Sequence, residues 1–565
     1  MIKKSFIVAI ILLLPVLCRF ARAVEDAAPD AENCLICHRF RGLASVDREG
    51  AYRLFYVDEG LFSQGPHAGV GCKDCHADIE KVPHDGAKPV DCSSCHDVEE
   101  PTRKTMLAHE KLRDSVHTSV EQDGTPRAFQ EDYPDCRDCH DKNFIRYYFT
   151  HGTTRLHKVR DPCEVVGTCA KCHANTVMAR RHNLLDVVSS YMETYHGKAI
   201  IFGSSKAPDC LDCHAGQGSI HKMHAKMDQR SSINPKNRPA TCSSENCHVS
   251  AAPALSSFDV HTNRDMATNP LLFGVALFFV VMTLAILLPI LTLNVLGLVR
   301  EIFPSHEAEQ EVKRLENLIK SKAAIGGGIL RFTGALRLQH LFLVIVFLVL
   351  CLTGFPRTFA KAKWSPVVLG FFGGINGAPI VHRIAGVALM VGFAVHIASI
   401  FLNVRSVLAK EGKRGIKSYV IKIMSLPMIP RAQDMKDLVV LTKYVFFLSP
   451  QRPNYDRFHW KEKLEYLGLF WGIPLLGVTG ILLWAVNISS HVLPGWVLNV
   501  AYLAHTYESI LAAAHIALVH IPSVVGMSGL LSFSAMLHGK ITPKVQAKEH
   551  GREIERWHSA EETNE

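Results

Sequence analysis

The sequence contains none of the motifs that usually indicate the chemistry of a soluble enzyme. It has no glycine-rich phosphate-binding loop and no Ser-His-Asp set with supporting context. Its formal net charge of +9 lies mostly in loops after residue 300, so the charge gives no reason to expect a nucleic acid partner. Of 17 cysteines, only Cys18, Cys163 and Cys351 fall outside one recurring pattern. These absences leave that pattern, and the long apolar runs of the second half, as the informative features.

The recurring pattern is C-x-x-C-H, the attachment sequence of a c-type haem. Six regular copies are followed by a seventh with four residues between its cysteines. The cysteines are Cys34, Cys37, Cys72, Cys75, Cys92, Cys95, Cys136, Cys139, Cys169, Cys172, Cys210, Cys213, Cys242 and Cys247. The histidines that follow are His38, His76, His96, His140, His173, His214 and His248. Zinc would need four ligands in paired clusters and would not explain these histidines, so we predict seven covalent c-type haems.

A second histidine on the far side of each iron would make it six-coordinate and suited to electron transfer. Eleven further histidines lie between residues 24 and 265. We predict that six of them are distal ligands: His67, His84, His117, His196, His221 and His261. The seventh distal ligand is one of His109, His151, His157, His182 or His224, and the sequence does not rank them.

The N-terminus combines a basic start, an apolar run and the sequence Ala21-Arg22-Ala23, which together predict a secretory signal peptide over residues 1–23. A retained membrane anchor is the alternative. Either segment would deliver residues 24–265 to the outer face of a membrane, where we expect the haem domain. Because each haem has only about 35 residues of chain, the macrocycles must supply most of the buried apolar surface, with short helices, loops and little sheet.

Five apolar stretches are long enough to span a bilayer. They are approximately 271–299, 338–355, 379–404, 464–484 and 501–525. The loop 403–463 carries 13 Lys and Arg against 5 Asp and Glu, whereas 488–500 carries neither kind. By the positive-inside rule, the loop 403–463 and the C-terminus lie in the cytoplasm.

The resulting fold class is mostly α, with a loop-rich multihaem cytochrome c domain, a transmembrane anchor helix and a four-helix transmembrane cytochrome b bundle. The predicted parts are a signal peptide at 1–23, a periplasmic heptahaem domain at 24–265, an anchor at 266–300, a cytoplasmic amphipathic linker at 301–335, a dihaem domain at 336–530 and a cytoplasmic tail at 531–565. Within the linker, Val312, Leu315, Leu318 and Ile319 have helical spacing. This stripe predicts a helix lying on the inner membrane surface, and an ordinary solvated linker helix is the alternative.

Histidines within the last four spans predict two b-type haems, because ionisable groups at membrane depth usually serve function. His382 and His505 both begin spans at the outer face, so we expect them to hold the outer haem. His520 lies towards the inner face, and its partner is either His340 or His396. Glu508, one helical turn from His505, is a candidate proton acceptor at an outward-facing site, with a structural role as a partner of Arg383 or of a neighbouring helix as the alternative.

Two resemblances accompany these patterns. The run Tyr191-Met192-Glu193-Thr194-Tyr195-His196 followed by the sixth motif resembles the repeat of periplasmic multihaem c-type cytochromes. The segments around His340, His382, 457–472 and 505–520, with the tail 538–551, resemble the dihaem cytochrome b family that supplies membrane subunits to formate dehydrogenases and nickel–iron hydrogenases. That resemblance implies that His340 pairs with His520. The fusion as a whole resembles inner-membrane cytochromes of metal- and sulfate-reducing bacteria that carry menaquinol electrons to the periplasm.

We therefore predict a multi-pass inner-membrane protein that oxidises quinol at the dihaem b domain and passes electrons through seven c-type haems to a periplasmic cytochrome or reductase. Its partners would be the quinone pool, the lipid bilayer and that acceptor. Reverse flow, from a periplasmic hydrogenase or formate dehydrogenase to quinone, uses the same residues and is the alternative. A terminal oxyanion reductase is less favoured because every motif ends in His and spare histidines exceed the demand. A haem-based sensor is disfavoured because no signalling domain follows the last span.

Overall fold

The computed structural model describes residues 33–46, 52–63, 65, 67–84, 87–88, 90–96, 112–140, 149–150, 157–158, 161–215, 220–244, 247–261, 264–326, 328–525 and 529–562. The predicted signal peptide at 1–23 lies outside these residues. The chain forms two compact units, which are described separately. The first comprises 1–188 and 208–237, and the second comprises 189–207 and 238–565. The units therefore do not divide at residue 265, where the composition of the sequence changes.

The first unit consists of short helices joined by loops, with very little sheet. Its helices are α2 (Leu35–His38), α3 (Glu59–Phe62), α4 (Cys72–Cys75), α5 (Ser93–His96), η1 (Gln130–Asp132), α7 (Cys136–Cys139), α8 (Pro162–His173), α9 (Thr176–Arg181) and α12 (Cys210–His214). Two antiparallel pairs complete it, β1 (Ala44–Val46) with β2 (Tyr52–Leu54), and β3 (Phe149–Thr150) with β4 (His157–Lys158). Helix α10 (Val187–Met192) crosses into the second unit.

In three of the C-x-x-C-H motifs, an aspartate just before the second cysteine closes the helical turn. Asp74 accepts a hydrogen bond from the backbone N–H of Gly71 at 2.9 Å. Asp138 and Asp212 each accept from the residue before the first cysteine, at 2.7 Å. Such a bond satisfies an N–H that the first turn of a helix leaves without a partner. The motif is thus held as a turn by its own side chain, with little help from surrounding structure.

Only a small apolar cluster is buried in the described part of the first unit. Val165 of α8 and Leu211 of α12 form it, with Ala215, Ile220 and Met223 packed against them. A cluster of this size buries far less apolar surface than a domain of this length normally needs for stability. That bound macrocycles provide most of the apolar interior stays a prediction.

The second unit is dominated by long helices. It begins with α11 (Tyr195–Ile201), α13 (Arg238–Cys242) and η2 (Pro253–Ser257). The helices that follow are α14 (Pro270–Ile302), α15 (His306–Gly326), α16 (Gly334–Thr358), α17 (Ser365–Phe371), α18 (Gly374–Lys410), α19 (Ile416–Met424), α20 (Ala432–Val445), α21 (Trp460–Trp484), α22 (Val486–Val492), α23 (Gly495–His515), η3 (Ile516–His520), α24 (Ile521–Val525), α25 (Gly529–His538), α26 (Pro543–Glu549) and α27 (Gly551–Glu562). Strands β5 (Ile329–Leu330) and β6 (Lys540–Ile541) pair in antiparallel fashion.

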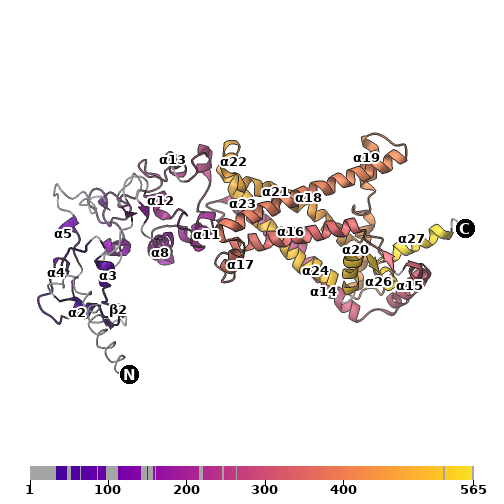
Figure 1. The fold of residues 1–565 in the computed structure, drawn as a ribbon, viewed down its shortest axis with the longest axis horizontal. Helices are drawn as coiled ribbons and strands as arrows, with labels where there is room; N and C mark the ends of the chain where they lie inside the picture. Colours follow the sequence, from indigo (N-terminus) through magenta and orange to yellow (C-terminus); the bar gives the residue numbers. More distant parts are fainter. Residues whose placement is uncertain are drawn as a thin grey trace, which may run out of the picture. The chain divides into compact units, whose positions relative to one another are not determined.

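Five helices of this unit are long and apolar enough to cross a membrane: α14, α16, α18, α21 and the continuous run from Gly495 to Val524. Four contain a stretch predicted from the sequence and the fifth covers all but the last residue of 501–525, so the chain is a multi-pass membrane protein of mostly helical structure. In Figure 1, α16, α18, α21 and α23 lie side by side, and α14 packs against α23. Leu287 and Ile290 of α14 share a buried cluster with Leu511 and Val519.

The linker helix α15 packs against protein along its apolar stripe. Leu315 and Ile319 are buried against Ala547 of α26 and Ile554 of α27, and Val312 and Leu318 flank them. The stripe was predicted to lie on the inner membrane surface, but the C-terminal helices cover it. The sequence could not indicate this, because the partner helices lie more than 200 residues further along the chain.

A buried ion pair fastens α20 to α21. The ammonium group of Lys463 lies 2.8 and 2.9 Å from the two carboxylate oxygens of Asp434, and their side chains are 8% and 10% exposed. We predict that Asp434→Ala lowers the free energy of unfolding by about 3–5 kcal/mol, because it leaves a buried charge without its partner. Thermal unfolding of the detergent-solubilised protein measures this loss.

Lys413 is the matched control for that experiment. It pairs with Glu411 at 3.0 Å but is 63% exposed, so Lys413→Ala should cost no more than about 1 kcal/mol. Equal losses for the two variants would show that the pair between Asp434 and Lys463 does not secure these helices.

Candidate functional site

Two imidazole rings face each other across the helical bundle, one of them at the middle of α23. The ring centroids of His382, on α18, and His505, on α23, are 6.3 Å apart. Two metal–imidazole bonds of about 2 Å each, together with the half-width of each ring, separate trans imidazoles by about 6 Å. The space between these rings therefore suits one metal ion held by both nitrogens.

A threonine fixes the orientation of each ring in this pair. The hydroxyl of Thr353 donates to the carbonyl oxygen of Val349 at 2.7 Å and lies 2.9 Å from Nδ1 of His382. Because the hydroxyl hydrogen is used in the helix, the oxygen accepts from Nδ1–H. Thr479 repeats the arrangement on α21, 2.7 Å from the Leu475 carbonyl oxygen and 3.0 Å from Nδ1 of His505. Both rings are thus held with Nε2 unprotonated, as a metal ligand requires.

A glycine directly after each threonine makes room for the ring. A β-carbon on Gly354 would lie 3.1 Å from Cε1 of His382, and one on Gly480 would lie 3.3 Å from Cε1 of His505. Both distances are shorter than ordinary van der Waals contact. The same arrangement, a Thr-Gly pair facing a histidine of a neighbouring helix, thus occurs once on α16 and once on α21. The role of these two dipeptides was not predicted from the sequence, although their positions, 29 residues before His382 and 26 before His505, are a signal that could have been used.

A second pair of rings lies further along the bundle, with one ring in the first half of α16 and the other at the end of η3, 15 residues after His505. The centroids of His340, on α16, and His520 are 6.3 Å apart. Nδ1 of His520 donates to the Glu465 carboxylate at 2.9 Å, which leaves Nε2 free to act as a ligand. His520 ends a π-helical turn, η3, that follows α23. A π turn winds by fewer degrees per residue than an α turn, so it offsets the excess rotation that 15 residues of ideal helix would place between His505 and His520.

His396 is not brought opposite His520. Its Nε2 lies 2.8 Å from the hydroxyl of Tyr466, and its Nδ1 lies 3.3 Å from Oε1 of Gln339. The geometry thus favours the first of the two alternatives left open by the sequence, in which His340 faces His520.

Glu508 is buried on α23, one turn from His505 in the direction of His520. Only 4% of the residue is exposed. Its carboxylate accepts a hydrogen bond from the indole N–H of Trp471 at 3.2 Å, and Gly472 beside it leaves space for the carboxylate. Arg383 instead lies over the ring of Trp484. The structural partner of Glu508 is therefore a neighbouring helix and not Arg383.

Five motif histidines also face a predicted distal histidine. The ring pairs, with their centroid separations, are His38–His84 at 6.0 Å, His96–His67 at 6.0 Å, His173–His117 at 6.2 Å, His140–His221 at 6.1 Å and His248–His196 at 6.2 Å. The first four pairs lie in the first unit, and the fifth lies in the second unit. Their separations match those of the two membrane pairs. In the first pair, Nδ1 of His38 lies 2.8 Å from the Phe55 carbonyl oxygen, a common second partner for a metal-bound histidine.

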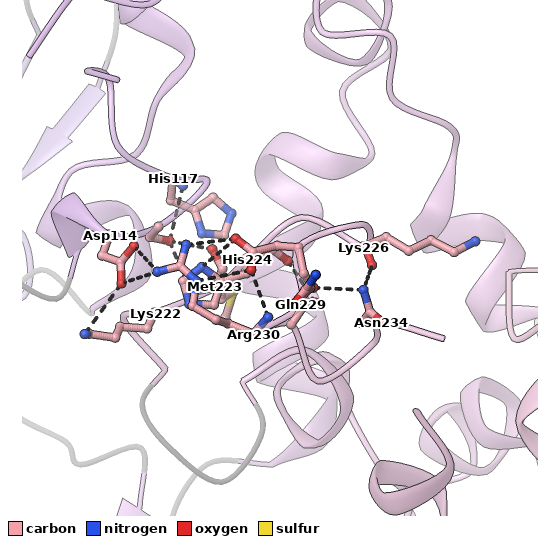
Figure 2. A network of polar contacts seen from close by, with 12 residues as sticks. Asp114, His117, Lys222, Met223, His224, Lys226, Gln229, Arg230 and Asn234 are labelled. Atoms are coloured by element: carbon pink, nitrogen blue, oxygen red, sulfur yellow. Dashed lines mark hydrogen bonds and ion pairs between the residues drawn. The ribbon is translucent and has the colours of Figure 1, made fainter. Parts of the chain in front are cut away.

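A polar network ties together the segments that carry His117 and His221 (Figure 2). The guanidinium of Arg230 binds both carboxylate oxygens of Asp114 at 2.8 and 3.0 Å. The backbone N–H of Val116 donates to the Met223 carbonyl oxygen at 2.8 Å. Burial, with His173 opposite, lowers the pKa of His117 to about 4, so its ring is neutral at neutral pH. The network thus positions two predicted ligands that are about 100 residues apart in the chain.

The distal partners predicted for His76 and His214 stay predictions. The ring of His261 lies 6.3 Å from that of Tyr191, and its Nδ1 lies 3.4 Å from the Ser190 hydroxyl. Two candidates for the seventh ligand lie beside carboxylates, with His182 3.0 Å from Asp132 and His224 3.8 Å from Asp228. The other three are His109 and His151, which lie outside the described residues, and His157, which lies in β4.

Comparison with known families identifies the membrane part. The family model described as prokaryotic cytochrome b561 matches residues 331–539. The matched range contains α16, α18, α21 and α23 and both of the imidazole pairs they carry. This part of the chain is a cytochrome b membrane domain, and the family implies haem b and electron transfer across the membrane involving quinone. No curated protein matches the chain.

The residues fit the cofactor that the family implies. His382 with His505, and His340 with His520, would each hold one haem b iron through Nε2. Three of these four rings have an Nδ1 partner that sets the required tautomer. Haem iron between two imidazoles supplies one-electron transfer, because no coordination position is left for a substrate.

We predict that Thr353→Val weakens haem b binding at the pair formed by His382 and His505 by roughly 10- to 100-fold. Valine keeps the shape of threonine but removes the hydroxyl oxygen that accepts from Nδ1–H of His382, so the ring keeps only its contact with the Leu350 backbone. Haem b per chain, measured by pyridine haemochrome after haem-depleted membranes are titrated with haem, reports the change. Thr292→Val is the matched control, since Thr292 also donates to the carbonyl oxygen four residues earlier but is exposed on α14. Equal haem affinity in the two variants would contradict the orienting role.

Proposed function

We propose that the chain oxidises membrane quinol at its cytochrome b domain and passes the electrons through seven covalent c-type haems to an acceptor outside the membrane. The observation that carries this proposal is the set of seven facing imidazole pairs. All seven have ring centroids 6.0–6.3 Å apart, and five contain the histidine of a C-x-x-C-H motif. One-electron relays need such six-coordinate sites.

The charge of the loops supports the orientation. The stretch 403–463 is strongly basic, and it joins α18 to α21, whereas the stretch 488–500 between α21 and α23 has no Lys, Arg, Asp or Glu. By the positive-inside rule, the first faces the cytoplasm and the second faces the periplasm. His382 and His505 are then the outer pair, and the N-terminal haem segments lie in the periplasm. Electrons would leave the bilayer at the face where the c-type motifs are located.

Quinol oxidation releases two protons with its two electrons, so a proton acceptor is needed within the membrane. Glu508 supports this role, because it is the carboxylate one turn from His505 and has no cationic partner among the described residues. The indole of Trp471 holds the carboxylate in one orientation while leaving its second oxygen open to a proton. Thr353 and Thr479 hold the imidazoles of His382 and His505 in the tautomer that leaves Nε2 unprotonated, as an iron ligand requires.

The proposal predicts the order of reduction. When the oxidised full chain is mixed anaerobically with menadiol, the b-haem band should appear before the c-haem bands. His382→Ala should abolish c-haem reduction, whereas His306→Ala, which removes an exposed histidine of α15 that contacts Gln310, should leave it intact. Reduction of c haems ahead of b haems would contradict the proposal. The reverse direction would be established by two results together. Menadiol would fail to reduce the wild-type protein, and pre-reduced c haems would rapidly reduce quinone.

A further prediction concerns Glu508. Glu508→Gln keeps the shape and can accept the hydrogen bond from Trp471, but it cannot take up a proton. Because a positioned base typically contributes about 10²- to 10⁴-fold to a proton-transfer step, turnover with menadiol should fall by at least tenfold while the haem spectra stay unchanged. Trp471→Phe, which removes the indole N–H but keeps the carboxylate, should have a much smaller effect. Turnover of the glutamine variant at the wild-type rate would remove Glu508 from the mechanism.

A further inference from the structure

One C-x-x-C-H-type motif belongs to the same compact unit as the membrane helices. The second unit includes residues 189–207 and 238–261, and these two segments, called the junction segments below, carry His196 and the seventh motif. The rings of His196 and His248 face each other at 6.2 Å. Of the five ring pairs that contain a motif histidine, this is the one built within the membrane unit.

Hydrogen bonds hold the junction segments on one end of the bundle. The Lys198 ammonium donates to the hydroxyl of Tyr502 on α23 at 2.6 Å. The Asn499 side chain bonds the backbone of Asp259 twice, accepting from its N–H and donating to its carbonyl oxygen, both at 2.9 Å. Gly495 lies so close that a β-carbon there would be 2.4 Å from the backbone nitrogen of Phe258. Lys198 and Asn499 are both buried, so this contact is a packed interface.

The cytochrome b domain also orients the motif histidine itself. Nδ1 of His248 lies 3.1 Å from Oδ1 of Asn487 on α22. The amide nitrogen of Asn487 donates to the Ser250 hydroxyl at 3.0 Å, which fixes Oδ1 as the atom that accepts from His248. The second partner of this imidazole is therefore supplied by the membrane domain. By contrast, His38 uses a backbone carbonyl of its own unit.

The guanidinium of Arg357 contacts the segment that carries His196. Arg357, on α16, stacks over the ring of Tyr195 at 5.3 Å, and Tyr195 directly precedes His196. Arg357 is also one helical turn after Thr353, whose hydroxyl lies 2.9 Å from Nδ1 of His382. In the part of the chain that the structure describes, no carboxylate pairs with Arg357. A partly buried cation in this position favours an anionic partner, and the propionates of a haem on either side have that chemistry.

We infer that the seventh motif, Cys242 to His248, holds the haem that exchanges electrons directly with the cytochrome b domain, and that Arg357 is the positioning residue between the two cofactors. This inference rests on the proposed function. With haems bound, His382 and His505 would hold the iron that donates one electron, and His196 and His248 would hold the iron that accepts it. No bond forms or breaks in this step and no proton moves, while quinol supplies the electron and the remaining c haems carry it away.

The first test removes the seventh attachment site from the full chain with Cys242→Ser and Cys247→Ser. The mass of the denatured protein should fall by one covalent haem. After mixing with menadiol, the b haems should still be reduced, but the rate of c-haem reduction should fall on the order of tenfold or more. An unchanged mass, or c-haem reduction at the wild-type rate, would overturn the inference. A failure of the proposed function would give a different result, because menadiol would then not reduce the b haems of the wild-type protein.

The second test keeps every haem in place. Arg357→Gln should lower the midpoint potentials of one b haem and one c haem, because a nearby positive charge stabilises the reduced irons. Arg357→Lys should restore most of both potentials. Lys361→Gln is the matched control, since Lys361 is a cation of the adjoining segment that pairs with Glu193 but is 63% exposed. Unchanged potentials in Arg357→Gln, or a shift confined to a single haem, would show that Arg357 does not lie between the two cofactors.

Discussion

The structure depends on the pairing of imidazoles about 6 Å apart with their Nε2 atoms turned inward. This arrangement is costly for a chain without a bound group, because it holds polar rings apart around a space that neither ring fills. Neighbouring groups fix several of these rings. In the membrane, buried hydroxyls and one carboxylate take the Nδ1–H groups, and in the first unit a backbone carbonyl does the same for His38.

The same arrangement of threonine, glycine and histidine occurs twice in the bundle. Thr353-Gly354 on α16 faces His382, and Thr479-Gly480 on α21 faces His505, so two different helices each present a hydroxyl and a gap to an imidazole of the neighbouring helix. Each threonine hydroxyl donates a hydrogen bond to the carbonyl oxygen four residues earlier in its own helix. Its oxygen also accepts a hydrogen bond from Nδ1–H of the imidazole. A position of this kind tolerates little change, since valine removes the acceptor and alanine in place of glycine displaces the ring.

Much of this organisation can be predicted from the sequence, because it depends on the spacing of the cysteine motifs and on long apolar runs. The spacing of C-x-x-C-H identified the motif histidines, and apolar runs located all five membrane helices. Five of the six predicted distal histidines face a motif histidine, but the sequence did not indicate which motif each one faces. His84 faces His38 of the first motif, and His67 faces His96 of the third, so neither faces the motif that follows it in the chain. Such pairing is set by tertiary contacts such as the bond between Arg230 and Asp114, which no local pattern reveals. The choice of His340 over His396 depended likewise on helix rotation and on the π turn before His520.

The central claim is that one chain carries two kinds of haem in fixed number, and a haem count by pyridine haemochrome on the purified full chain tests it most directly. Seven motifs and two membrane pairs predict seven haem c and two haem b per chain. Four or fewer haem c, or no haem b, would contradict the account.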